Sequence, residues 1–395
     1  MKLVCCFFLI FCLFPSQICT AADLNGHFKS LNLYQQPTYA QDQDIWLSAD
    51  SLRFDLLGKI NSLGSAWQIS LEQLFLYQDP RDSLSLPVAG RNRLEELAWD
   101  GNSAHALSWQ LQIDRLSLQW DWDASVLTVG RQAVGFGRIS LFSPLDVIAP
   151  FAPTELDSEV RPGVDALRMQ HYFDIVGEAG ATVVVAENQT QSSVLGDLTL
   201  NAGKIDFLLI GGRLRDRSMI GLGMSGQLGG LGVKGEWAGY RGSDVGEFGG
   251  DLHGKFSIAG LEFEYRFAVD LILQLQYLYN GPGSDSPEEY PLVVQTAALQ
   301  ESLTYLYGRH YLLSALSRDL TPLIRLSGLL IFNLNDDSWM LRPLLGVSLM
   351  DNISLDIFWN LYQGDKPNMV AGQLIPCSEF GSVKDGGGFL FKMYF

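Results

Sequence analysis

Apolar and polar side chains alternate along many short segments of this chain. The segment "NISLDIFWNLY" (352–362) places every second side chain, from Ile353 to Leu361, on one apolar face and puts Ser, Asp and Asn on the other. Segments 261–267 and 271–280 alternate in the same way. This spacing is typical of β-strands whose two faces meet different surroundings.

The alternation predicts eighteen strands, with sixteen as the alternative count because the segment at 192–200 has the weakest pattern. They span residues 26–34, 45–57, 65–77, 109–119, 124–134, 164–173, 178–187, 192–200, 204–213, 218–228, 231–241, 260–267, 271–280, 305–317, 322–333, 338–350, 352–362 and 387–395. Pro343 falls inside one of them, where we expect a β-bulge. Long connections follow odd-numbered strands, and tight turns such as "DWDA" and "DIVG" follow even-numbered ones. This pattern indicates an all-β fold, a transmembrane antiparallel β-barrel.

The N-terminal "MKLVCCFFLIFCLFPSQICTAAD" has the features of a secretory signal peptide. Its apolar run, Leu3 to Phe14, has 12 residues, and a spanning helix needs about 20. We predict cleavage after Ala22, so that residues 1–22 are the signal and 23–395 the barrel. A lipid anchor at Cys19 is the alternative, although "SQI" is a poor match to such sites. The exported chain would keep only Cys377 and form no internal disulfide.

Composition agrees with a membrane barrel: the chain has 40 Gly, 22 Phe, 14 Tyr and 9 Trp, and 18% of its residues are charged. No apolar stretch after residue 22 is long enough for a spanning helix, which leaves a closed barrel as the way to cross a bilayer. The net charge of −17 argues against nucleic acid as a partner.

The last strand, "FLFKMYF", carries an apolar row of every second residue that ends in a terminal aromatic. The row consists of Phe389, Phe391, Met393 and Phe395. It resembles the membrane-insertion signal of bacterial outer-membrane barrels. The resemblance implies an outer-membrane location, contact with the lipid bilayer and lipopolysaccharide, and recognition of this strand by the barrel-assembly machinery.

Motifs for catalysis or cofactor binding are weak. "GLGMSG" (221–226) matches a dinucleotide fingerprint, but it lies within an expected barrel strand, so we interpret its glycines as structural. The five histidines are scattered and none has metal-ligand spacing. We therefore predict no metal, no cofactor and no enzymatic reaction, and a catalytic cluster assembled from distant strands remains an alternative.

Ten charged side chains fall on the face that should line the lumen, because a lipid-facing Arg or Lys near the midplane costs about 2–4 kcal/mol. They are Arg53, Asp55, Glu72, Asp114, Glu262, Glu264, Arg266, Arg325, Arg342 and Asp356. Two interpretations remain open. The charges pair with one another in a water-filled wall, or they form a polar path for solutes.

The connection 135–163 is apolar and contains four prolines, which favours a segment folded into the barrel rather than an extracellular cap. Its charges and those of the flanking strands would then line the narrowest point. They are Arg131, Arg138, Asp146, Glu155, Asp157, Glu159, Arg161, Asp165 and Arg168.

The sequences "GRQ", "FSPLDVIAP" and "RPGVDALR" in this region resemble outer-membrane porins related to the alginate-export family. The resemblance implies an 18-stranded monomeric channel with an arginine-lined pore, and it points to Arg131, Arg138, Arg161 and Arg168. The acidic residues in the same loop depart from that pattern, so we carry over the class and not the substrate.

The expected function is passive diffusion of small polar or anionic solutes. The alternatives are an exopolysaccharide export channel with periplasmic partners, a barrel sheath for electron carriers, and a barrel-borne enzyme.

Overall fold

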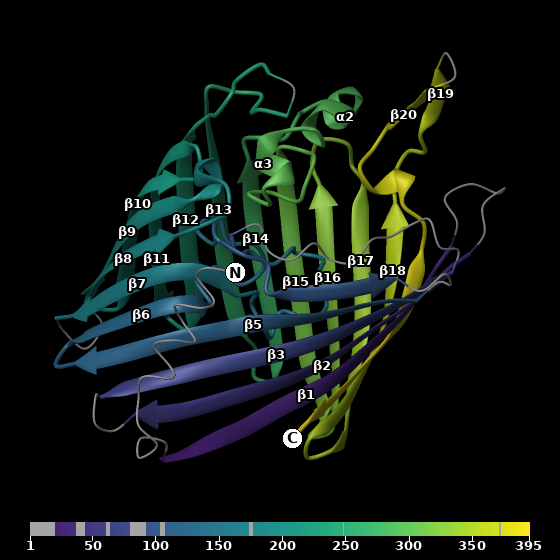
Figure 1. Ribbon diagram of the computed structural model, residues 1–395. Coiled ribbons are helices and arrows are strands. Elements are labelled where there is room, and N and C mark those ends of the chain that lie inside the picture. The colour runs from purple at the N-terminus through teal and green to yellow at the C-terminus, as the bar shows by residue number, and fades with distance from the viewer. Residues whose placement is uncertain are drawn as a thin grey trace.

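The computed structural model describes residues 20–36, 44–60, 64–79, 92–102, 107–173, 177–247, 249–370 and 373–395. Eighteen antiparallel strands form a closed barrel (Figure 1), in which the last strand pairs with the first from His27↔Tyr394 to Gln35↔Gly386. The predicted fold is therefore confirmed. The predicted signal peptide lies largely outside the described residues, and β1 keeps a regular register with β2 from Asp23↔Leu57 onward.

The barrel strands are β1 (Thr20–Gln35), β2 (Ile45–Ile60), β3 (Ser65–Asp79), β5 (Leu107–Trp122), β6 (Ser125–Gln132), β7 (Val164–Tyr172), β8 (Glu178–Val184), β9 (Ser193–Ala202), β10 (Ile205–Leu214), β11 (Arg217–Leu228), β12 (Leu231–Arg241), β13 (Lys255–Arg266), β14 (Leu271–Asn280), β15 (His310–Thr321), β16 (Ile324–Asn333), β17 (Trp339–Met350), β18 (Ile353–Gln363) and β21 (Gly386–Tyr394). The strand expected at 192–200 is present as β9. A short additional strand, β4 (Ala98–Asn102), pairs with the free edge of β5 beyond the end of β6.

The prediction of a β-bulge at Pro343 is wrong. β17 and β18 keep one register from Leu341↔Leu361 to Leu344↔Phe358, and Pro343 pairs with Gly328 on β16. Proline lacks the N–H that the ladder would use, so the pairing with β18 is interrupted without an inserted residue. The register shift in β17 lies further on, between Ser348 and Met350.

Long connections gather at one rim of the barrel and short turns at the other, here called the long-loop rim and the short-turn rim (Figure 1). The connection 281–309 carries two one-turn helices, α2 (Tyr290–Val293) and α3 (Ala297–Gln300). The connection 364–385 carries a small hairpin of β19 (Asn368–Val370) and β20 (Gln373–Ile375). None of the described helices is long and apolar enough to cross a membrane.

The outer face of the barrel is apolar, as in a sheet that faces lipid. In β21 the side chains of Phe389 and Phe395 are exposed on this face, whereas Leu390, one residue away, is 4% exposed on the inner face. The Phe395 ring lies 5.7 Å from that of Phe54. The predicted apolar row of β21, which includes Phe391 and Met393, therefore lies on the outer face.

Candidate functional site

The connection between β6 and β7, here called the inward loop (residues 133–163), folds into the barrel as predicted. Its apolar side chains form a core with the inner wall and with connection 281–309, rather than a cap outside the barrel. The buried members are Val134, Phe136, Ile139, Phe142, Leu145, Val147 and Ile148. Tyr305 donates a hydrogen bond to the Pro150 carbonyl at 2.8 Å, so connection 281–309 covers the loop.

Three wall side chains, Glu236 on β12, Glu262 on β13 and Gln276 on β14, accept hydrogen bonds from the backbone of this loop. We call them the loop seat. Glu236 accepts from the backbone N–H groups of Arg138, Ile139 (2.9 Å) and Leu145 (3.1 Å), and from the Ser143 hydroxyl (2.6 Å). Glu262 accepts from the N–H groups of Ser140 and Leu141, and Gln276 accepts from that of Phe142. Because a loop without regular structure leaves its N–H groups unpaired, these side chains supply the acceptors that a buried backbone requires.

Glycines in the wall make room for the tip of the inward loop. A Cβ atom added to Gly221 would lie 2.4 Å from Leu145 Cδ2, and one added to Gly260 would lie 2.9 Å from Ile139 Cδ1. Gly221 belongs to the "GLGMSG" segment of β11, which agrees with the structural interpretation of its glycines. Leu145 is fully buried.

The returning arm of the inward loop reaches the seam of the barrel, where the first and last strands pair. Lys29 on β1 lies 2.6 Å from Asp157 and 2.8 Å from Glu159, and Lys392 on β21 lies 2.9 Å from Glu159. Burial opposes the charge of Glu159, but hydrogen bonds from Lys29, Tyr394 and Lys392 outweigh it and lower the pKa of that carboxyl to about 2. The loop is thus anchored at two separated parts of the wall.

Ion pairs also hold the middle and the root of the loop. Arg161 lies 2.6 Å from Asp146, whose burial raises its pKa to about 6 despite this cation. Arg131 makes two bonds to Asp165, at 2.8 and 3.0 Å, and also donates to the carbonyls of Ile113 and Glu95. Arg131 is 2% exposed, so it fixes the loop to the wall instead of facing an open path.

A buried charge cluster on β2, β3 and β5 joins four of the predicted lumen residues. Arg53 contacts Asp55 at 2.9 Å, Asp114 at 2.8 Å and Glu72 at 4.0 Å. Asp114 also pairs with Arg93 and Arg115. In this region the wall is charged but internally neutralised.

A β-bulge explains how Arg115 joins this cluster. The register of β3 with β5 shifts between Ser70↔Arg115 and Leu71↔Ile113, so Asp114 is the extra residue. An inserted residue breaks the alternation of faces, and two consecutive side chains can then point inward. Strict alternation had placed Arg115 on the outer face, which is why the sequence did not identify it.

Three cations on the β7–β10 side have few acidic partners. Arg168 on β7 lies 3.9 Å from Glu178 and packs over the Phe136 ring of the loop. Arg138 donates to the Thr199 hydroxyl at 3.2 Å, and no carboxylate among the described residues pairs with it. Lys204 lies in the turn that follows β9, also without an ion pair in the described part of the chain. The three cations lie at different heights along β9. Arg168 is level with Leu195, Arg138 with Thr199, and Lys204 with the β9–β10 turn, so each is closer than the last to the short-turn rim.

The other predicted residues lie apart from this path. Arg266 pairs with Asp270 and Arg325 with Asp319 at the short-turn rim, and both arginine side chains are more than 60% exposed. Arg342 is 7% exposed and donates to Asn360 at 2.6 Å. Asp356 lies 3.3 Å from Lys392 in the lumen, and Glu155 accepts from the Ala152 N–H within the loop.

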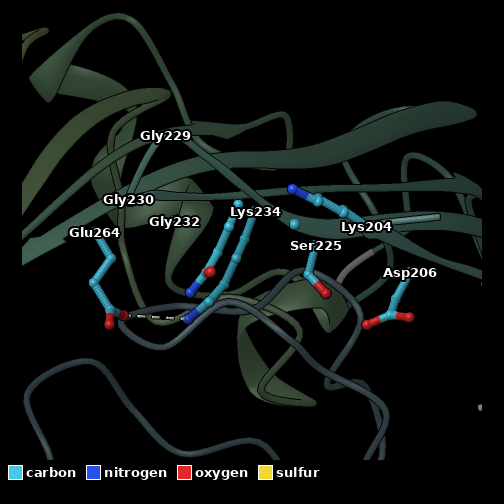
Figure 2. A pocket seen from close by; sticks show the side chains of 10 residues that line it. Lys204, Asp206, Ser225, Gly229, Gly230, Gly232, Lys234 and Glu264 are labelled. Carbon is cyan, nitrogen blue, oxygen red and sulfur yellow. Dashed lines mark ion pairs between the residues drawn. The ribbon is translucent and has the colours of Figure 1, made fainter.

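A hollow of about 580 Å³ lies in the inner wall near the short-turn rim (Figure 2). Gly232 is one of four glycines that line it, and the register places this glycine between Gln227 on β11 and Glu264 on β13, where a side chain would otherwise stand. Lys204, Asp206, Ser225 and Lys234 also line the hollow. Lys234 pairs with Glu262 at 2.9 Å and Glu264 at 3.7 Å, and it donates to the Ser140 hydroxyl of the inward loop at 2.6 Å. The hollow therefore opens directly below the loop tip.

Sequence reasoning missed several residues of this site: Lys29, Arg93, Arg115, Lys204, Lys234, Glu236 and Lys392. Glu236 and Lys392 stand on the inner face of strands that were predicted, so strict application of the alternation would have included them. Arg93 lies outside the predicted strands, and its contacts to Gln112 and Asp114 follow from the tertiary fold. The described residues contain no group of His, Cys, Asp and Glu placed to hold a metal ion.

No protein-family model matches the sequence, and the search of curated proteins found no match. Solved structures do match along almost the whole chain. OccAB4 from Acinetobacter baumannii is 11% identical, covers 97% of this chain and 100% of its own, and has a TM-score of 0.58. OccD3 (OpdP) from Pseudomonas aeruginosa is 9% identical, with 96% and 92% covered and a TM-score of 0.55.

This chain has the fold of an outer-membrane porin. OccK8 (OprE) from Pseudomonas aeruginosa extends the likeness, with 7% identity, 95% and 98% covered and a TM-score of 0.56. Because the sequence identities are this low, the similarity shows a shared fold and nothing more. The relation to alginate-export barrels that the loop motifs implied finds no support among these neighbours.

Proposed function

We propose that this porin-fold barrel is a passive channel of the cell outer membrane for small polar solutes, and that it favours anions. The observation that carries the proposal is the inward loop, which crosses from β6 to the loop seat on β12–β14 and then to the seam at β1 and β21. A segment fixed across the lumen narrows it while leaving a polar wall beside it. The solved structures of the same fold support a channel rather than an enzyme.

The anion preference rests on the three cations that have few acidic partners. Arg168, Arg138 and Lys204 stand at successive depths on one side of the lumen, whereas the arginines of the β2–β5 cluster are neutralised by Asp55, Glu72 and Asp114. Guanidinium and ammonium groups facing water attract carboxylate or phosphate groups of a solute and can pass it from one to the next. The paired wall and the polar path expected from the sequence thus occupy different parts of the barrel.

The structure gives less support to the alternative functions. An exopolysaccharide conduit and a sheath for electron carriers both require an open lumen, and the buried inward loop and its cover from connection 281–309 occupy that space. A catalytic cluster would need a nucleophile beside a base. Ser125 and His171 are 2.9 Å apart, but they lie where β6 begins and where β7 ends, and the buried His27 of the inner wall packs against the Tyr394 ring. We therefore retain diffusion of small solutes as the function.

The proposal extends to location and assembly. We infer export through the N-terminal signal and insertion through the β21 strand, whose Phe389 and Phe395 face outward, by the barrel-assembly machinery. Fractionation of the tagged protein and sequencing of its mature N-terminus test both statements. A mature chain beginning at Asp23 in the outer-membrane fraction is expected, and retention of residues 1–22 would contradict the signal.

Planar-bilayer recording tests the channel. We expect discrete conductance steps and, in asymmetric salt, a reversal potential that indicates anion preference. Replacing Arg138 and Arg168 by Glu should reverse or abolish that preference, whereas the same change at Arg266 and Arg325, at the exposed rim, should have a smaller effect. Absence of any conductance from folded protein would overturn the channel, and cation preference in the unmodified protein would overturn the role of the three cations.

A further inference from the structure

A row of cations lies on the outer face of the barrel at the long-loop rim, away from the lumen. The register joins Arg213 on β10 to Ser218 on β11, Ser218 to Arg241 on β12, and Arg241 to Lys255 on β13. These residues therefore stand side by side on four neighbouring strands. With strands about 4.8 Å apart, the row is about 14 Å long.

The row faces outward and is open to its surroundings. Arg241 lies four residues along its strand from the exposed Trp237 of the outer face, Arg213 four residues from Leu209, and Lys255 six residues from Leu261. The Arg213 side chain is 67% exposed and lies 3.1 Å from Asp216. No ion pair within the described residues involves Arg241 or Lys255. The row thus has net positive charge that the protein leaves largely uncompensated.

An apolar hollow of about 320 Å³ lies directly on the membrane side of this row. Its floor includes Gly196 on β9 and Gly211 on β10, which occupy outward positions without a side chain, and its walls include Leu198, Leu209 and Ile220. Gly211 is two residues from Arg213, which is about 7 Å along the strand. A polar head held by the row would therefore have its apolar part above the hollow.

The position of these two features in the membrane follows from the loops. Barrels of the outer membrane place their long loops outside the cell and their short turns in the periplasm. The cation row then lies at the outer surface, at the level of lipid headgroups, and the apolar hollow lies in the outer leaflet. The outer leaflet of such a membrane is built from lipopolysaccharide, whose phosphorylated disaccharide carries several acyl chains.

We propose that the outer face of β9–β13 binds one lipopolysaccharide molecule, with its phosphates on Arg213, Arg241 and Lys255 and one acyl chain in the hollow of Gly196 and Gly211. Guanidinium groups bind phosphate through two parallel hydrogen bonds, and an ammonium group adds a point charge. The exposed Asp216 pair is weak in water and yields to a phosphate. The site lies outside the lumen and is separate from the channel function, but it rests on the proposed outer-membrane location.

Binding of lipid A to the purified, delipidated barrel in detergent tests the headgroup half of the site. The probe is bisphosphorylated lipid A, and dephosphorylated lipid A and phosphatidylglycerol are the comparison lipids. We expect the triple variant R213Q/R241Q/K255Q to bind bisphosphorylated lipid A at least tenfold more weakly. The control R266Q/R318Q/R325Q, which removes three exposed cations at the short-turn rim, should bind as the unmodified barrel does.

Filling the hollow tests the part of the proposed site that would bind the acyl chain. A Cβ atom at Gly196 or Gly211 would have no neighbour closer than 3.5 Å, so Gly196→Leu and Gly211→Leu fit without moving the backbone. We expect these variants to weaken binding of acylated lipid A several-fold and to leave binding of the deacylated, water-soluble phosphorylated disaccharide unchanged. Heat-modifiable migration on gels verifies that each variant is folded.

Three outcomes would overturn the proposal. Equal binding of dephosphorylated and bisphosphorylated lipid A to the unmodified barrel would remove the role of the cations without reliance on any variant. Equal binding of phosphatidylglycerol would reduce the row to a general anionic-lipid contact. Equal losses in the two triple variants would show that total charge, and not this row, attracts the lipid. A barrel that binds lipid A but conducts no ions would refute the channel and leave this site intact.

Discussion

Glu236 is the wall side chain on which the position of the inward loop most depends. It is 4% exposed and accepts hydrogen bonds from three backbone N–H groups and one hydroxyl of the loop tip. Replacing it by alanine leaves those donors beside a small apolar side chain. Both sides of the loop tip then lose their attachment to β12, while Glu262 and Gln276 still hold residues 140–142 between them.

The free-energy cost of Glu236→Ala can be estimated from the hydrogen bonds that are lost. A buried donor that loses its acceptor costs about 1–3 kcal/mol, and water entering from the lumen offsets part of this. Taking about 1 kcal/mol for each of the three N–H groups gives roughly 3 kcal/mol. Since about 1.4 kcal/mol changes an equilibrium tenfold, Glu236→Ala should raise the population of barrels with a detached loop tip about 100-fold.

Single-channel recording measures this shift. We expect Glu236→Ala to show a larger-conductance substate with longer dwell times, because the detached tip widens the lumen. Glu236→Gln keeps one acceptor oxygen and should give an intermediate effect. Glu264→Ala is the control, since that carboxylate contacts Gln274 and Lys234 on the wall. A Glu236→Ala barrel with the amplitude and dwell times of the unmodified protein would refute the reasoning.

Three further changes test other contacts of the loop and wall. Gly221→Val should cost about 1–3 kcal/mol and disturb the seating of Leu145, seen as lower thermal stability and altered conductance, because the added Cβ would lie 2.4 Å from that side chain. Asp114→Asn should cost about 3–5 kcal/mol in denaturant unfolding, because three buried arginines lose their shared carboxylate, and an unchanged midpoint would contradict the cluster's role. Burial raises the pKa of Glu379, in connection 364–385, to about 7, so stability should fall as pH rises from about 4.5 through 7, and Glu379→Gln should flatten the melting temperature over that range.

The strands were predictable because alternation is a local property. The sequence placed a strand at 231–241 and the structure has β12 at the same residues, Leu231–Arg241, since lipid and lumen select side chains independently at each position. The reasoning failed where the backbone departs from a regular pleat. At the β5 bulge, Asp114 and Arg115 both point inward, and no feature of "QIDRL" announces the extra residue.

The inward loop was predictable in kind but not in its contacts. A long connection rich in apolar side chains has to bury them, which favoured the lumen over the outside. The contact partner of each loop residue could not be predicted from the sequence, because Ile139 and Glu236 are 97 positions apart and meet only when the barrel closes. Glu236 was not among the predicted lumen charges, and its role as an acceptor for backbone N–H groups follows from the tertiary structure alone.

The net charge of −17 therefore does not describe the charge that a solute meets. Inner carboxylates are largely engaged: Glu236 and Glu262 by loop N–H groups, Asp114 by arginines and Glu159 by lysines. A carboxylate whose oxygens accept several charged or backbone donors projects little field into the water beside it, whereas a cation without a partner projects its full charge. On the proposed function, selectivity would then follow from the groups left unpaired, Arg138 and Lys204 above all, so that an acidic protein would present an anion-attracting path.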